Sequence, residues 1–195
     1  GHKAAARVPG IELASIPDVW LGGLGLLCGR DGLVFPPNVY PLYVPGMLER
    51  LGAANPGMQS WLGAVQDGNA VVRSLDRPAI APLHPNRVFG HFLMEMVPKV
   101  LLLDQCCPKD WPVAAAAFPS WLRPILELLM PWREIVWYDP NREVMKAPRF
   151  VTSTQFLQGE QIHPEFRALV EMAKARIVLN SGERTPEARR RIYVS

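Results

Sequence analysis

The sequence predicts an α/β fold in which helices cover a mainly parallel sheet. Between residues 70 and 152, runs with strand character alternate with runs of helical spacing, at intervals of ~10–20 residues. The chain has 195 residues, of which 49% are hydrophobic and 20% are charged, a composition typical of a globular protein with one sizeable core. No internal repeat or low-complexity tract is present, which argues against solenoid and disordered classes.

The first part of the fold is predicted to be a β-hairpin followed by short elements. Residues 16–37 contain brief apolar runs broken by glycine, and Arg30-Asp31-Gly32 has the composition of a tight turn. The elements that follow are two short helices, a turn and two short strands, expected at residues 46–53, 60–66, 66–69, 70–72 and 78–81.

A mostly buried helix is predicted over residues 87–105. His91 and Glu95 stand four residues apart inside it, so their side chains share one face of the helix. The hydrophobic residues around them spread over the remaining faces, which indicates burial. Pro98 removes one backbone donor and is expected to kink the helix after its second turn.

Strands and helices alternate in the rest of the prediction. The strands are expected at residues 111–116, 134–138 and within 144–152, where 149–152 is the better candidate. The alanines of the first of these segments are equally compatible with the start of a helix. The helices are expected at residues 119–130 and 165–179, the second ended by Gly182. A polar, arginine-rich segment then leads to a last strand at residues 191–195.

Charge, hydropathy and cysteine usage restrict the function classes. A net charge of +3 is too small to indicate nucleic acid binding, and the arginine-rich end lacks the interleaved aromatic residues of such surfaces. No apolar run approaches the ~18 residues that a membrane span needs. Cys28, Cys106 and Cys107 match neither a disulfide framework nor a zinc site, so buried free thiols in a reducing cytoplasm are expected.

The His91–Glu95 pair allows three interpretations when it is taken alone. The two side chains can simply satisfy each other at the edge of a helix. A metal site is the weakest interpretation, because no third ligand stands at a recognisable spacing. The third is a catalytic imidazole with a supporting carboxylate.

The whole stretch around this pair resembles the signature of glycosyltransferase family 61. The run Gly-His-Phe-Leu-Met-Glu-Met-Val-Pro-Lys, from Gly90 to Lys99, is similar to the family motif Gly-His-(Phe/Trp)-Leu-x-Glu-x-(Leu/Val)-Pro-(Arg/Lys). Residues 190–195 match the second hallmark of the family, Arg-x-(Ile/Leu)-Tyr-(Ile/Val)-Ser-Arg, up to its serine. With the Asp-Gly hairpin, the resemblance spans roughly residues 16–195 in the right order.

This resemblance implies the Rossmann-like N-terminal domain of a two-domain GT-B glycosyltransferase, preceded by the β-hairpin region. Residues 1–15 would then be a tag, linker or flexible start, and residues 16–180 the acceptor-side α/β domain. Residues 181–195 would be a basic linker and the first strand of the donor-binding domain. Because the donor-binding half supplies most nucleotide-sugar contacts in GT-B enzymes, residues 1–195 alone are expected to be inactive.

The implied activity is an inverting sugar transfer that needs neither a metal nor another cofactor. The donor is a nucleotide sugar, and the acceptor is a glycan or another hydroxyl compound. Bacterial members are often described as capsular or exopolysaccharide biosynthesis proteins, which together with the cysteine-poor sequence favours the bacterial cytoplasm. No nucleic acid partner and no integral membrane segment are expected, whereas a homo-oligomer is allowed. The alternative function is a non-catalytic sugar- or protein-binding module with a transferase-like fold.

The resemblance also assigns expected roles to the residues of the motif. His91 is the expected general base, with Glu95 orienting or polarising its ring. The reverse assignment, with Glu95 as the base and His91 in contact with phosphate or sugar, stays open. Gly90 would let a substrate approach the helix closely, or it would serve tight packing. Lys99 stands where arginine is commoner in the family, so it keeps the positive charge but loses a bidentate contact.

The basic side chains of the two motifs are the expected substrate-binding groups. A leaving diphosphate without a metal needs cations or helix N-termini to stabilise it. A solvated basic turn is the competing interpretation of the arginines. The residues in question are Lys99, Arg189, Arg190 and Arg191.

Overall fold

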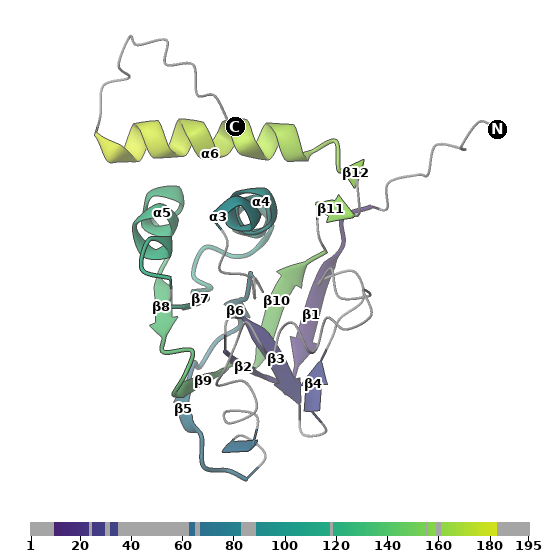
Figure 1. Cartoon of the computed structure of the whole chain (residues 1–195), viewed down its shortest axis with the longest axis vertical. Coiled ribbons are helices and arrows are strands. Elements are labelled where there is room, and N and C mark those ends of the chain that lie inside the picture. The colour runs from purple at the N-terminus through teal and green to yellow at the C-terminus, as the bar shows by residue number, and fades with distance from the viewer. Residues whose placement is uncertain are drawn as a thin grey trace, which may run out of the picture.

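A computed structural model of the chain describes residues 10–23, 25–29, 32–34, 63–64, 67–82, 89–117, 119–154, 156–158 and 161–182. Within these residues the protein has an α/β fold with two five-stranded sheets, a small two-stranded ribbon and a set of helices on one side (Figure 1). The α/β class predicted from the sequence is therefore confirmed.

The first sheet is mainly parallel. Its strand order is β1 (Leu13–Pro17), β10 (Arg149–Ser153), β6 (Ala79–Ile80), β7 (Val113–Ala116) and β8 (Ile135–Tyr138). The strands from β10 to β8 run parallel to one another, and β1 adds an antiparallel edge. This sheet contains most of the strands that the alternating sequence pattern predicts.

The second sheet is mixed. Its order is β4 (Gly32–Val34), β3 (Leu26–Gly29), β2 (Trp20–Gly22), β9 (Glu143–Lys146) and β5 (Val71–Ser74). Only the β5–β9 pair is parallel among its described ladders. Gly29 pairs with Gly32 across β3 and β4, which confirms the predicted hairpin around residues 30–31.

The helices form a separate layer. Helix α4 (Val97–Cys106) and helix α5 (Leu122–Leu129) connect β6 to β7 and β7 to β8, as expected for βαβ units. Helix α6 (Phe166–Ser181) follows the ribbon of β11 (Leu157–Gln158) and β12 (Gln161–Ile162), and it packs across α4 and α5 (Figure 1). Its end at Gly182, with φ of 67°, confirms the predicted stop.

The first sheet lies between two hydrophobic cores. Val113 and Ala115 of β7 contact the core beneath the helices, whereas Ala114 and Ala116 contact the core shared with the second sheet. Successive strand residues point to opposite faces, so a strand buried on both sides needs apolar residues throughout. This explains why Val113–Ala116, within the segment predicted at residues 111–116, form a strand despite their alanines.

Several expectations at the edges of the fold need correction or are outside the described residues. β1 begins at Leu13, so residues 13–15 belong to the first sheet and not to a flexible start. The sheet prediction was too simple, because a second, mixed sheet covers the face opposite the helices. The expected helix at 46–53, most of the one at 60–66, and the strand at 191–195 lie outside the described residues.

Candidate functional site

The segment that carries His91 is helical, but it is not one regular α-helix. It consists of α3 (Phe89–His91), the π-helical turn η1 (Phe92–Met96) and α4. The N–H of Val97 donates to the carbonyl of Phe92, five residues earlier. Pro98 has no N–H to donate, and its ring would crowd the carbonyl of the preceding turn in an α-helix. The wider turn relieves this crowding, so the disturbance predicted at Pro98 takes the form of a π-turn.

His91 and Glu95 form a hydrogen-bonded pair. Nδ1 of His91 lies 2.5 Å from Oε1 of Glu95, and the side chains are 51% and 10% exposed. A carboxylate oxygen accepts, so Nδ1 donates, and Nε2 of the neutral imidazole keeps its lone pair. The buried carboxylate thus fixes the tautomer and orientation of an imidazole that solvent can reach.

Lys99 lies one helical turn beyond Glu95 and is buried, with 1% of its surface exposed. Burial lowers its pKa to about 7, and the negative charge of Glu95 opposes this shift. His91, Glu95 and Lys99 therefore follow one another at steps of four residues, from solvent into the protein. The structure places Lys99 behind Glu95 and not on the surface, where direct contact with a substrate was expected.

Gly90 is exposed, and its surroundings are open. A Cβ added at this position would meet no atom within 4 Å. Tight packing, one of the two expected roles of this glycine, is therefore wrong. Phe89 and Leu93 beside it are 50% and 41% exposed, so the first turn presents apolar surface next to the imidazole.

An aromatic cluster holds this first turn in place. The ring of Trp121, just before α5, packs edge-on against Phe89 at 5.2 Å and against Phe92 at 5.0 Å between centroids. Phe92 is fully buried. Such contacts contribute beyond their buried area, and they join the start of α3 to the start of α5. No local sequence pattern marks Trp121, because its contacts are with residues of a separate element.

The site follows the carboxyl end of a central strand. α3 comes after β6, and the strand order of the first sheet reverses between β6 and β10. Ligands of open α/β sheets bind outside the carboxyl ends of the strands, at such a reversal. The position of α3 in the chain is therefore one at which α/β proteins place functional groups.

Comparisons of the chain with protein-family models, with curated proteins and with solved structures found no match. Among the described residues, no helix is long and apolar enough to span a membrane. Within the same residues no group of three or more His, Cys, Asp and Glu side chains is placed to hold a metal ion. Arg189, Arg190 and Arg191 lie outside the described residues, so their expected contacts stay predictions.

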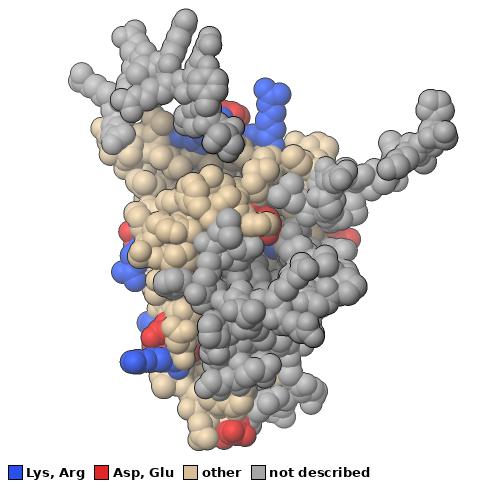
Figure 2. All heavy atoms as spheres, in the orientation of Figure 1, with Lys and Arg blue, Asp and Glu red and all other residues tan. Residues whose placement is uncertain are grey.

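Charged side chains are mixed on the described surface. On the face shown in Figure 2, Lys and Arg side chains lie near Asp and Glu side chains and do not form one broad basic patch. Cys28 and Cys107 are buried free thiols, as expected, whereas Cys106 is exposed. Burial raises the pKa of Cys28 and of Cys107, which keeps both as unreactive thiols.

A buried ion cluster that no sequence pattern predicted lies at the other end of α4. Asp104 is fully buried and accepts hydrogen bonds from Arg133 at 2.8 Å and Arg176 at 2.9 Å. Lys109 and Trp132 donate to the same carboxylate at 3.0 and 3.3 Å. Burial would raise the pKa of Asp104, but the hydrogen bonds from Lys109, Arg133 and Trp132 outweigh it and hold the pKa below its ordinary value.

Proposed function

We propose that the chain is the acceptor-side part of an inverting, metal-independent GT-B glycosyltransferase, in which His91 takes the proton of the acceptor hydroxyl. The observation that carries this proposal is the 2.5 Å contact between Nδ1 of half-exposed His91 and the buried carboxylate of Glu95. A ring held in this way presents Nε2 as a base. The resemblance of residues 90–99 to the family 61 signature supports the same assignment.

The reaction is a substitution at the anomeric carbon of the donor sugar. The acceptor oxygen forms a bond to this carbon while the bond from the carbon to the diphosphate breaks. The proton of the acceptor moves to Nε2 of His91, and the bonding electrons leave with the nucleoside diphosphate. Glu95 then stabilises the imidazolium that has formed. Attack from the face opposite the leaving group inverts the anomeric configuration.

The topology supports a Rossmann-like domain as part of this proposal. β6, α4, β7, α5 and β8 form two successive βαβ units with parallel strands. The second sheet replaces the second helix layer of a doubly wound fold. The GT-B assignment therefore rests on the helix-covered half of the domain and on the sequence motifs.

The remaining motif residues receive roles that fit their surroundings. Gly90 leaves open space beside the imidazole, where an acceptor ring can lie against the exposed Phe89. Lys99 acts on Glu95 from the interior, because it is too deeply buried to reach a surface ligand. Arg189, Arg190 and Arg191 remain the proposed contacts of the diphosphate.

The test is sugar transfer by a protein that includes the donor-binding half implied by the resemblance. Release of nucleoside diphosphate is measured with uridine, guanosine and thymidine diphosphate sugars and a panel of glycan acceptors. His91→Ala should lower kcat by about 10²–10⁴, the usual contribution of a general base. Glu95→Gln keeps an acceptor for Nδ1 but removes the charge, so its loss should be smaller.

The matched control is His163→Asn. His163 lies in the turn before α6, where its Nδ1 accepts the N–H of Glu165 at 3.2 Å, and an asparagine carbonyl can accept the same bond. This variant should transfer sugar like the parent. If His91→Ala also stays within a few-fold of the parent, the assigned base is wrong. Sugar binding by the parent with no transfer to any acceptor would favour the non-catalytic binding module.

A further inference from the structure

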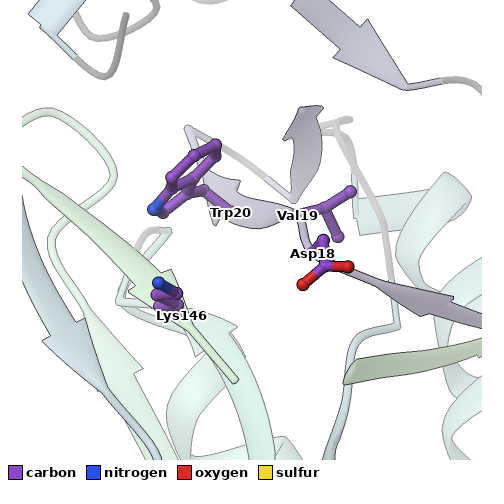
Figure 3. Close-up of a pocket in the computed structure, with 4 residues that line it drawn as sticks. All are labelled: Asp18, Val19, Trp20 and Lys146. Atoms are coloured by element: carbon purple, nitrogen blue, oxygen red, sulfur yellow. The ribbon is translucent and has the colours of Figure 1, made fainter. Parts of the chain in front are cut away.

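A second site is suggested by a pocket of about 420 Å³ on the second sheet (Figure 3). Asp18, Val19, Trp20 and Lys146 line it. Its volume lies within the range of small-molecule sites. The lining residues lie in or next to β2 and β9 of the second sheet, whereas His91 lies in α3 on the helix side of the first sheet, so the pocket is separate from the proposed transferase site (Figure 1).

The pocket exists because two neighbouring strands change sheets at the same level. The ladder between β1 and β10 ends with Pro17 opposite Arg149, and the ladder between β2 and β9 begins with Trp20 opposite Lys146. Between these two ladders the strands are not paired with each other, because residues 18–19 and 147–148 carry the backbone between the two sheets. The interrupted pairing leaves a hollow beside residues 18–20 and Lys146.

Asp18 stands at the bend of the first of these strands. Its φ of 54° is the only positive value among the non-glycine residues that the structure describes. Aspartate tolerates this left-handed conformation better than most residues. Asp18 is exposed, and its carboxylate forms no hydrogen bond or ion pair within the described residues. As an exposed residue that lines the pocket, Asp18 can accept hydrogen bonds from a ligand through its carboxylate.

Lys146 and Trp20 form the opposite wall of the pocket (Figure 3). Nζ of Lys146 lies 6.0 Å from the centroid of the Trp20 ring, at the outer limit of a cation–π contact. Among the described residues no ion pair joins Lys146 to Asp18, although both line the same hollow. The pocket thus offers an ammonium, an aromatic face and a carboxylate to one small molecule.

We propose that this pocket binds a saccharide ring that carries an acidic group, such as a uronic acid. The acidic group pairs with Lys146, the apolar C–H face of the ring packs on Trp20, and ring hydroxyls donate to Asp18. A small zwitterion such as glycine also matches the two charges, but it offers no apolar face to the Trp20 ring. Carbohydrate recognition here needs no catalysis at His91.

The test is a ligand-observed NMR titration of the 195-residue chain with methyl glucuronide and with neutral methyl glucoside. We expect the glucuronide to bind more tightly than the glucoside. Lys146→Met keeps the aliphatic stem and removes the charge, so it should weaken glucuronide binding by about tenfold and leave glucoside binding unchanged. Asp18→Asn keeps a residue suited to the bend and should weaken both sugars.

Lys174→Met is the matched control, because this exposed lysine pairs with Glu171 on α6, away from the pocket. It should bind both sugars like the parent. Absence of glucuronide binding by the parent, or equal binding by Lys146→Met, would overturn the proposal. Tighter binding of glycine than of glucuronide would also overturn it and assign the pocket to a zwitterion.

Discussion

Burial gives Lys99 an unusual protonation equilibrium for a lysine. Its pKa is lowered to about 7 by burial, despite the opposing charge of Glu95. In the unfolded chain the ammonium keeps its proton up to a pH of ~10.4. Between pH ~7 and ~10 the unfolded state therefore binds more protons than the folded state, so this residue makes stability rise with pH.

The variant Lys99→Met isolates this effect. From pH 7 to pH 9 the parent should gain about 2 kcal/mol of unfolding free energy that the variant does not gain. Urea denaturation at the two pH values measures this gain for the parent and for the variant. Subtracting one gain from the other cancels the contributions of the other titrating groups. Lys174→Met, at an exposed position, should behave like the parent. Equal pH dependence of the parent and Lys99→Met would show that Lys99 keeps an ordinary pKa.

Gly90 allows stability and function to be tested separately. Its missing Cβ would stand in open space, at a helical position without positive φ. Gly90→Ala should therefore leave the protein folded and raise its stability by up to about 1 kcal/mol. If an acceptor lies against this turn, the added methyl group should still lower kcat/KM for sugar transfer. Thermal unfolding and transfer assays on the same variant give the two readouts, and unchanged kcat/KM would remove Gly90 from the site.

At the scale of elements, the Asp104 cluster joins α4 to α6 and to two loops. Arg133 also donates to the carbonyls of Pro108 and Trp111, each at 2.7 Å, so one guanidinium holds the loop after α4. Arg176 reaches from α6 to Asp104 and to the carbonyl of Leu129. Asp104 thus helps to hold α6 over the other helices, together with the buried Leu169 and Ala173 of α6.

Asp104→Asn should destabilise the protein by about 3–5 kcal/mol, because it leaves buried guanidinium groups without their countercharge. The pKa of Asp104 is lower in the folded protein than in the unfolded chain. The carboxylate therefore contributes its full stabilisation above the unfolded pKa of ~3.9, and this stabilisation is lost as pH falls through the folded pKa. Chemical denaturation at neutral and acidic pH measures both effects. Glu171→Gln, which changes an exposed carboxylate, should have little effect, and equal stability of Asp104→Asn and the parent would contradict this account.

The helix before α4 shows how far local sequence determines an element. The spacing of His91 and Glu95 predicted their contact correctly, because the two residues share a face in any helix of this kind. Pro98 correctly predicted where the α-helix is disturbed, but it did not predict that the disturbance is a π-helical turn. A kink and a π-turn both accommodate a missing N–H, and the choice between them depends on packing that the local sequence does not specify.

At the scale of the whole molecule, the alternating pattern predicted the parallel sheet and its helices, since each βαβ unit is local in sequence. The second sheet was not predicted, because β5 pairs with β9 across more than sixty intervening residues. Hydrophobic periodicity identifies strands but not their partners. The same limit applies to Asp104 and Arg176, which lie 72 positions apart, and to the pocket shared by Trp20 and Lys146.

The passage of two adjacent strands between the sheets has a mechanical consequence. In the described residues the backbone passes between the two sheets through four short links, residues 18–19, 75–78, 139–142 and 147–148, and the first and last of these lie at neighbouring points. Any tilt of one sheet relative to the other must therefore be absorbed by a few torsion angles in these short links, including the left-handed φ of Asp18. A molecule bound in the pocket beside residues 18–19 would restrict this tilt.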